Sequence, residues 1–132
     1  MALKTKCIKK PREESDGWRL SIMSRHTLDD GTTPDPEIAL EMYDEWCPKF
    51  APRPRLIGAY KREEISWEKF EWEFMRYLAS PKIQPALCSL ARAARQFDIT
   101  ILCVEETPEH CHRRLVAEAC KKIDPSLEIV IE

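Results

Sequence analysis

The feature that most constrains the fold is a mainly apolar run near the C-terminus, Ile99-Thr100-Ile101-Leu102-Cys103-Val104. Such a run is typical of a strand that is covered on both faces. A helical pattern follows over residues 108–123, and residues 127–131 have the pattern of a closing strand. Strand, helix and strand with short connections imply a right-handed crossover and a parallel pair. The C-terminal part therefore predicts an α/β fold with a largely parallel sheet.

The upstream sequence adds two strands and three helices to this unit. Residues 18–25 alternate between apolar and polar side chains, which is the period of a strand with one buried face. We also expect a short strand around Ile8, a helix over 36–46, a proline-rich loop over 47–60, a helix capped by Ser66 that runs to Leu78, and a helix over 81–97. A chain of 132 residues can bury one good core. The prediction is a single domain, residues 1–132, built as a three-layer α/β sandwich with helices packed on a small sheet.

Charge and cysteine usage limit the partners and the compartment. The formal net charge is −2, with 21 basic and 23 acidic residues interspersed, so nothing attracts the whole chain to nucleic acid. No stretch approaches the roughly 20 apolar residues of a membrane helix, and the first ten residues lack a secretory signal core. The six cysteines are scattered without the spacing of a disulfide framework. We expect reduced thiols, a cytoplasmic location and no contact with membranes.

The most reactive residue types lie at the junction between the 99–104 strand and the 108–123 helix. Pockets of parallel sheets form beyond the carboxyl ends of the strands, where the next helix presents free N–H groups. We expect Thr107 to cap this helix and Pro108 to occupy its first turn. A helical wheel places His112 on the buried face at the edge of the sheet and His110 on the opposite, solvated side.

Three residues of this junction are candidates for catalysis. Cys111 lies in the first turns of a helix beside basic residues, a field that favours the thiolate and nucleophilic catalysis. His112 is a candidate general acid or base, and Glu105 continues the side of the strand that carries Cys103. A half-buried, inert Cys111 and a purely structural His112 are the competing interpretations.

Three further residues are candidates for holding an anionic ligand. Arg25, after the second strand, would converge on His112 if the two strands are neighbours, and Arg113 and Cys103 belong to the junction itself. The alternative is an ion-paired surface arginine at position 25 and a simply buried Cys103.

Metal and cofactor motifs are weak in this sequence. Cys103, Cys111 and His112, with His26, would supply a tetrahedral set, but there is no Cys-x-x-Cys pair, and we assign no metal ligand. With three glycines, the chain lacks the glycine-rich phosphate loops, so the cofactor stays unknown.

The segment 101–117 resembles the C-terminal signature of the domain of unknown function 488 (DUF488) family. That signature is a strand ending in Cys-x-Glu, here Cys103 and Glu105, followed by a turn and a Cys-His-Arg that opens a helix, here residues 111–113. Asp16-Gly17 with Arg25 and the segment 46–54 resemble other parts of the family more loosely. The family's Asp-x-Arg element lacks its aspartate in this chain, because the corresponding residues are Met23, Ser24 and Arg25. The resemblance implies a compact α/β domain and no established activity.

Two hypotheses for function follow. The first is an enzyme that acts on a small anionic or nucleotide-like substrate at the junction. The alternative is a non-catalytic ligand-binding or protein-interaction module that uses the same pocket. The aromatic residues and prolines of 46–60 would suit a homodimer contact.

Overall fold

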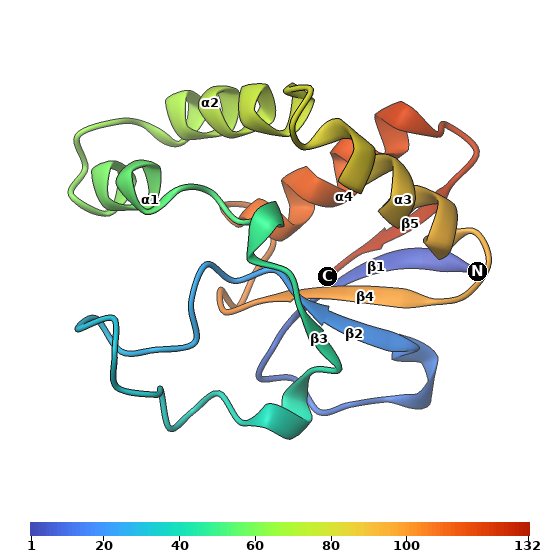
Figure 1. Cartoon of the computed structure of the whole chain (residues 1–132), viewed down its shortest axis with the longest axis horizontal. Helices are drawn as coiled ribbons and strands as arrows, with labels where there is room; N and C mark the ends of the chain where they lie inside the picture. The colour runs from blue at the N-terminus through green and yellow to red at the C-terminus, as the bar shows by residue number, and fades with distance from the viewer.

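The sheet is the centre of the structure. The computed structural model describes residues 1–132 and contains one five-stranded sheet. Its strands are β1 (Ala2–Cys7), β2 (Trp18–Ser21), β3 (Glu45–Trp46), β4 (Ile99–Cys103) and β5 (Glu128–Ile131). All pairs are parallel and the order is β3-β2-β4-β1-β5, which puts β4 in the middle (Figure 1). Every residue of β4 is buried, so the predicted strand covered on both faces is confirmed.

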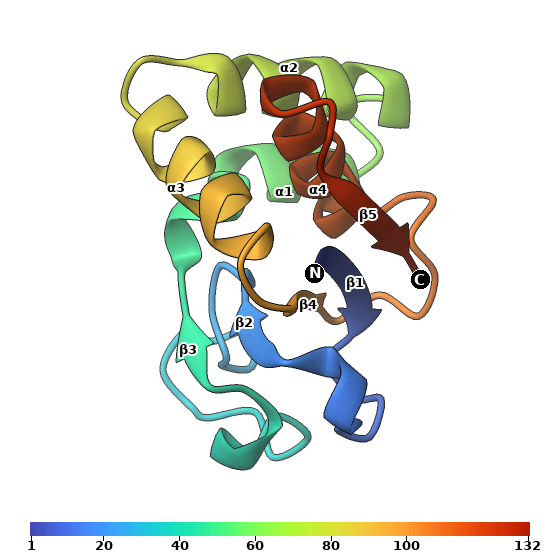
Figure 2. The same cartoon turned by 90° about the vertical axis from the view of Figure 1, so that its right-hand side faces the viewer.

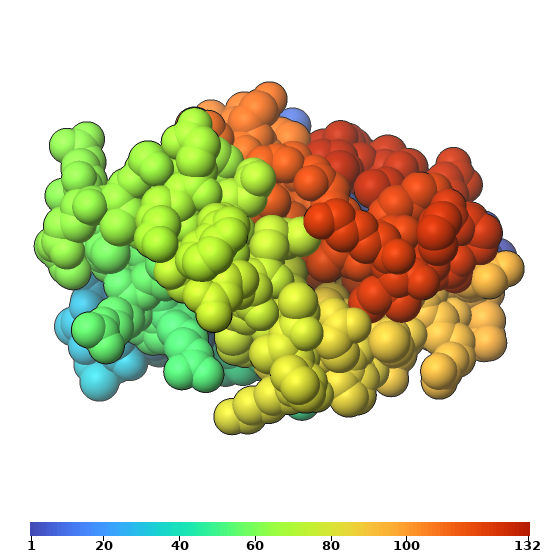
Figure 3. Space-filling model, turned by 90° about the horizontal axis from the view of Figure 1, so that it is seen from above, coloured from blue at the N-terminus to red at the C-terminus, as the bar shows by residue number.

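Four α-helices pack together on one face of this sheet (Figures 1 and 2). They are α1 (Pro54–Lys61), α2 (Trp67–Ala79), α3 (Gln84–Ala94) and α4 (His112–Ile123). Seen from above, they cover almost the whole of that face (Figure 3). Ser66 caps α2 as predicted, because its side chain accepts a hydrogen bond from the backbone N–H of Lys69 at 3.1 Å. No helix has the length and apolar content needed to cross a membrane.

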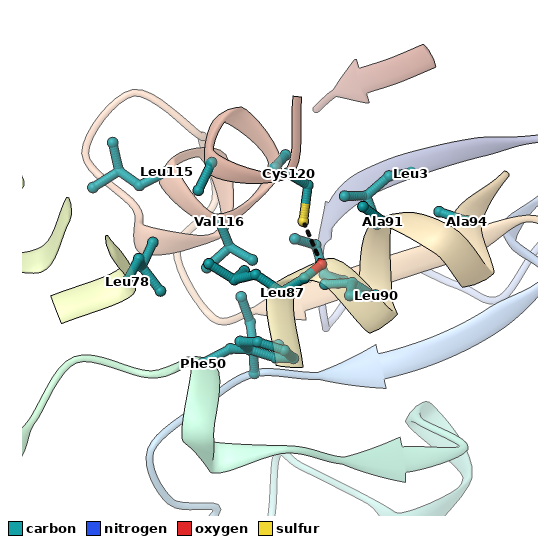
Figure 4. Packing of buried hydrophobic residues seen from close by; sticks show 14 of the residues in the cluster. Leu3, Phe50, Leu78, Leu87, Leu90, Ala91, Ala94, Leu115, Val116 and Cys120 are labelled. Carbon is teal, nitrogen blue, oxygen red and sulfur yellow. Dashed lines mark hydrogen bonds between the residues drawn. The ribbon is translucent and has the colours of Figure 1, made fainter. Parts of the chain in front are cut away.

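The hydrophobic core lies between the helices and the sheet. It is a cluster of 20 buried residues, and Figure 4 shows Leu87 of α3 near Leu78 of α2 and near Val116 and Cys120 of α4. The thiol of Cys120 donates a weak hydrogen bond to the carbonyl of Leu87. Apolar side chains at helical spacing on three helices therefore close one core over β4 and β1.

The opposite face of the sheet is polar. Lys6 of β1 and Arg19 of β2 are buried there, and both contact the carboxylate of Asp16, at 2.6 and 2.7 Å. The hydroxyl of Thr100 donates to the carbonyl of Asp16 at 2.7 Å. The covering layer consists of two 3-10 turns (Glu14–Asp16 and Leu40–Met42) and loops, as Figure 2 shows, and not of α-helices. The α/β class is confirmed, and its third layer is built from turns.

The segment 36–61 differs from the prediction. The helix expected over 36–46 is wrong, because this stretch holds only a 3-10 turn (Leu40–Met42) and β3. Its backbone pairs with β2 instead: the N–H of Asp44 donates to the carbonyl of Arg19, and that of Cys47 to Ser21, both at 2.8 Å. The loop expected over 47–60 ends early, because Pro54 opens α1, where its missing N–H costs no helical hydrogen bond.

Candidate functional site

Strand β4 and helix α4 bring the predicted site residues together at the carboxyl edge of the sheet. Cys103 is the last residue of β4, while Cys111 and His112 are the N-cap and first residue of α4. The expected helix start at Pro108, with Thr107 as its cap, is wrong. The N–H of Cys111 bonds to the carbonyl of Pro108 at 3.2 Å, and this turn delivers Cys111 to the helix in an extended conformation.

The carboxylate of Glu105 joins the two thiols. Its Oε2 accepts hydrogen bonds from Cys103 Sγ at 3.1 Å and from Cys111 Sγ at 3.3 Å. Both cysteines are buried, at 3% and 1% exposure, whereas Glu105 itself is exposed. One carboxylate oxygen therefore bridges two sulfur atoms from different elements.

The imidazole of His112 has a defined orientation. Its Nε2 lies 2.7 Å from the carbonyl oxygen of Ile22, which can only accept, so Nε2 carries the hydrogen. The other nitrogen, Nδ1, lies 3.6 Å from Cys103 Sγ. The ring of Phe74 meets the imidazole edge-on, with centroids 5.8 Å apart. His112 is thus fixed with Nδ1 presented to sulfur.

Arg113 supports this cluster from inside the protein. Its guanidinium is fully buried and donates to the carbonyl of Glu105 at 2.7 Å, to Cys111 Sγ at 3.2 Å and to the carbonyl of Glu132 at 3.1 Å. Arg113, which the sequence predicts as an anion-binding residue, therefore uses its hydrogen-bond donors within the protein. It ties the end of β5 to the turn after β4.

The charge states follow from these contacts. Although Glu105 as a residue is exposed, its carboxylate lies against the buried cluster, and this local desolvation opposes ionisation; the hydrogen bonds from Cys103 and Cys111 act in the other direction, and the pKa of the carboxyl is lowered. The neighbouring sulfur of Cys103, together with burial, raises the pKa of the Cys111 thiol far above its ordinary 9.0. The expected activation of Cys111 by the helix start is outweighed by these effects, so the free thiol is a poor nucleophile.

A cavity of about 510 Å³ opens onto the cluster. Cys103, Glu105 and His112 line it, whereas Cys111 and Arg113 do not. The remaining lining includes one wall of aromatic rings and a rim of charged side chains: Tyr60, Trp67, Phe70, His110, Arg25, Lys61, Asp29 and Asp35. Four of the six predicted site residues, Arg25 among them, therefore share one accessible space, and the other two do not line it.

Arg25 reaches the same cavity from the loop after β2. It is about half-exposed and pairs with Asp29 at 3.4 Å, a surface contact that a ligand can replace. Arg25 and His112 line the same cavity because β2 pairs with β4. His26 lies apart from the sulfur cluster, bonded to Ser21 Oγ at 2.7 Å and packed between Tyr43 and Trp46.

The aromatic wall was not predicted from the sequence. The sequence pattern predicts that Trp67 lies in the helix capped by Ser66 and Tyr60 at the end of a proline-rich loop. His110 is exposed, as expected, yet its ring stacks on Trp67 with centroids 4.8 Å apart and approaches the hydroxyl of Tyr60 at 3.4 Å. The helical spacing of Trp67 gave no signal for this, because the partner residues come from α1 and from the turn before α4.

These features define an α/β domain with a cysteine- and histidine-bearing site at the carboxyl edge of a parallel sheet. A family model described as the active DUF488-N3 subclade matches residues 3–123. The chain therefore belongs to the DUF488 family. Comparison with curated proteins and with solved structures found no match.

Proposed function

We propose that this protein is an enzyme that acts on a small anionic or nucleotide-like substrate bound in the cavity. The observation that carries the proposal is that Cys103, Glu105 and His112 line one cavity together with Arg25. A concave site with convergent polar groups and an aromatic wall is the usual form of a small-molecule site.

Each part of the cavity has a role in this proposal. Arg25 releases Asp29 and pairs with the anion of the substrate, while the Tyr60 and Trp67 rings accept a planar group. Glu105, ionised at neutral pH, is the general base. Cys103 Sγ and Nδ1 of His112, which are 3.6 Å apart, form the polar wall beside this base. The cluster needs reduced thiols, which a cytoplasmic location would provide.

The test of binding compares two half-exposed arginines, each paired with an aspartate. Nucleoside monophosphates and other small phosphorylated compounds are screened by thermal shift against the wild type, Arg25→Gln and Arg95→Gln. We expect a compound that stabilises the wild type and Arg95→Gln but binds Arg25→Gln about tenfold or more weakly, because a charge-assisted hydrogen bond contributes on the order of 1.5–3 kcal/mol. Equal affinity for both variants would remove Arg25 from the site.

The test of catalysis follows the bound compound by mass spectrometry. Glu105→Gln keeps the size of the side chain but cannot take a proton, so we expect binding to persist and turnover to fall by about 100-fold or more. A compound that binds in the cavity and is never converted by the wild type would favour the non-catalytic binding module.

A further inference from the structure

The sulfur cluster has the donor set of a transition-metal site. Cys103 Sγ, Cys111 Sγ and one ring nitrogen of His112 all lie within 4.8 Å of one another. Thiolate sulfur together with imidazole nitrogen favours zinc among the common divalent ions. We propose that Cys103, Cys111 and His112 bind one Zn²⁺ ion. This inference deepens the proposed function, on which the catalytic meaning of the ion rests.

The spacing agrees with tetrahedral coordination. With Zn–S near 2.3 Å and Zn–N near 2.0–2.1 Å, tetrahedral ligand atoms of these two kinds lie about 3.5–3.6 Å apart. Cys103 Sγ and His112 Nδ1 are 3.6 Å apart. Nδ1 is also the ring nitrogen that carries no hydrogen, as a ligand requires, because Nε2 donates to the carbonyl of Ile22. An imidazole held by a backbone carbonyl in this way is the usual arrangement of a metal-binding histidine.

The surrounding charges balance such a centre. Two thiolates and the carboxylate of Glu105 carry three negative charges, and Zn²⁺ with the guanidinium of Arg113 carries three positive ones. Arg113 is in position for this, because it already donates to Cys111 Sγ at 3.2 Å. The ion would replace the two thiol protons that now bridge to Glu105. No charge is left unpaired in the buried cluster.

Three protein ligands leave the fourth position of a tetrahedral ion for water or substrate, which is the pattern of catalytic and not of structural zinc. Cys103 and His112 line the cavity, so the ion would be reached from there, and Glu105 is the neighbouring carboxylate. A water in the fourth position would give its proton to Glu105 and keep the hydroxide on the ion. The site would then serve hydrolytic chemistry on the bound substrate.

Cobalt titration of the metal-free, reduced protein tests the proposal without any substrate. We expect one equivalent of Co²⁺ to bind with a sulfur-to-cobalt charge-transfer band, and Zn²⁺ to displace it. The matched variants are Cys111→Ser and Cys120→Ser, two buried positions of which only the first belongs to the donor set. Cys120→Ser should keep the band. Cys111→Ser should weaken the band to roughly half, because only Cys103 remains as a sulfur ligand, and should lower the affinity beyond the about 10–100-fold that an outer partner of a ligand costs.

X-ray absorption of the zinc-loaded wild type makes the test independent of how the variants fold. We expect two sulfur neighbours and one imidazole nitrogen. The absence of a charge-transfer band in the wild type, or sulfur-free coordination of zinc, would overturn the metal site. Neither result would change the nucleotide screen, so failure of the metal site and failure of the proposed function can be told apart.

Discussion

Asp16 is the residue on which the polar face of the sheet depends. Its side chain is fully buried and bonds to Lys6 and Arg19, which are themselves almost completely buried. Burial opposes the ionisation of Asp16, but the hydrogen bonds from Lys6, the backbone and Arg19 together lower the pKa of its carboxyl. Two buried cations therefore share one buried carboxylate, and Lys6 has a second, exposed partner in Glu13 at 3.5 Å.

Asp16→Asn should lower the free energy of unfolding by about 3–5 kcal/mol at neutral pH, because it removes the buried anion that Lys6 and Arg19 share. The folded-state pKa lies below the ordinary 3.8, so the contribution of Asp16 is present above pH 3.8 and is lost as the pH falls through the folded-state pKa. Urea unfolding at several pH values should show the gap between wild type and variant narrowing in acid. Asp124→Asn, whose partner Arg95 is exposed, is the control and should change stability far less. A gap that persists unchanged at the lowest pH would contradict this account.

At the scale of elements, α2 and α4 begin in two different ways. Ser66 caps α2 by accepting a hydrogen bond from the N–H of Lys69, whereas α4 begins at His112 after a backbone turn, and its N-cap residue Cys111 makes no side-chain cap. The first signal is local and readable from the sequence. The second depends on where β4 ends and where the turn after it can close. The observed start of α4, at residue 112, therefore lies four residues after the start predicted at residue 108.

Ser66→Ala should destabilise the protein by about 1 kcal/mol, because an N–H at the start of α2 loses its acceptor. Ser89→Ala is the matched control, since Ser89 is exposed in the middle of α3, where alanine favours the helix. Thermal and urea unfolding measure both variants. Equal stability of the two would mean that Ser66 does not act as a cap in solution.

At the scale of the whole molecule, one core holds the helices to the sheet and so fixes the site. Leu87 has no exposed surface and lies in the cluster that joins α2, α3 and α4. Leu87→Ala should lower the unfolding free energy by about 2–5 kcal/mol, while Leu40→Ala, at a position that is 78% exposed, should change it by less than about 0.5 kcal/mol. The measurement is urea unfolding followed by circular dichroism. A small loss for Leu87→Ala would contradict a tightly packed interface of the three helices.

The amino-acid sequence by itself determined the α/β class, the buried strand β4, the capped helix α2 and the Cys-x-Glu and Cys-His-Arg motifs at one junction. These follow from local periodicity and from residues close together in the chain, and both are properties of sequence alone. Only the tertiary structure decided that Cys103, and not Cys111, lines the cavity with His112, and that Tyr60 and Trp67 form its wall. It also turned the expected helix over 36–46 into a strand edge, because backbone groups of distant segments satisfied one another there. Pairing between remote segments fixes such contacts, and no local pattern records it.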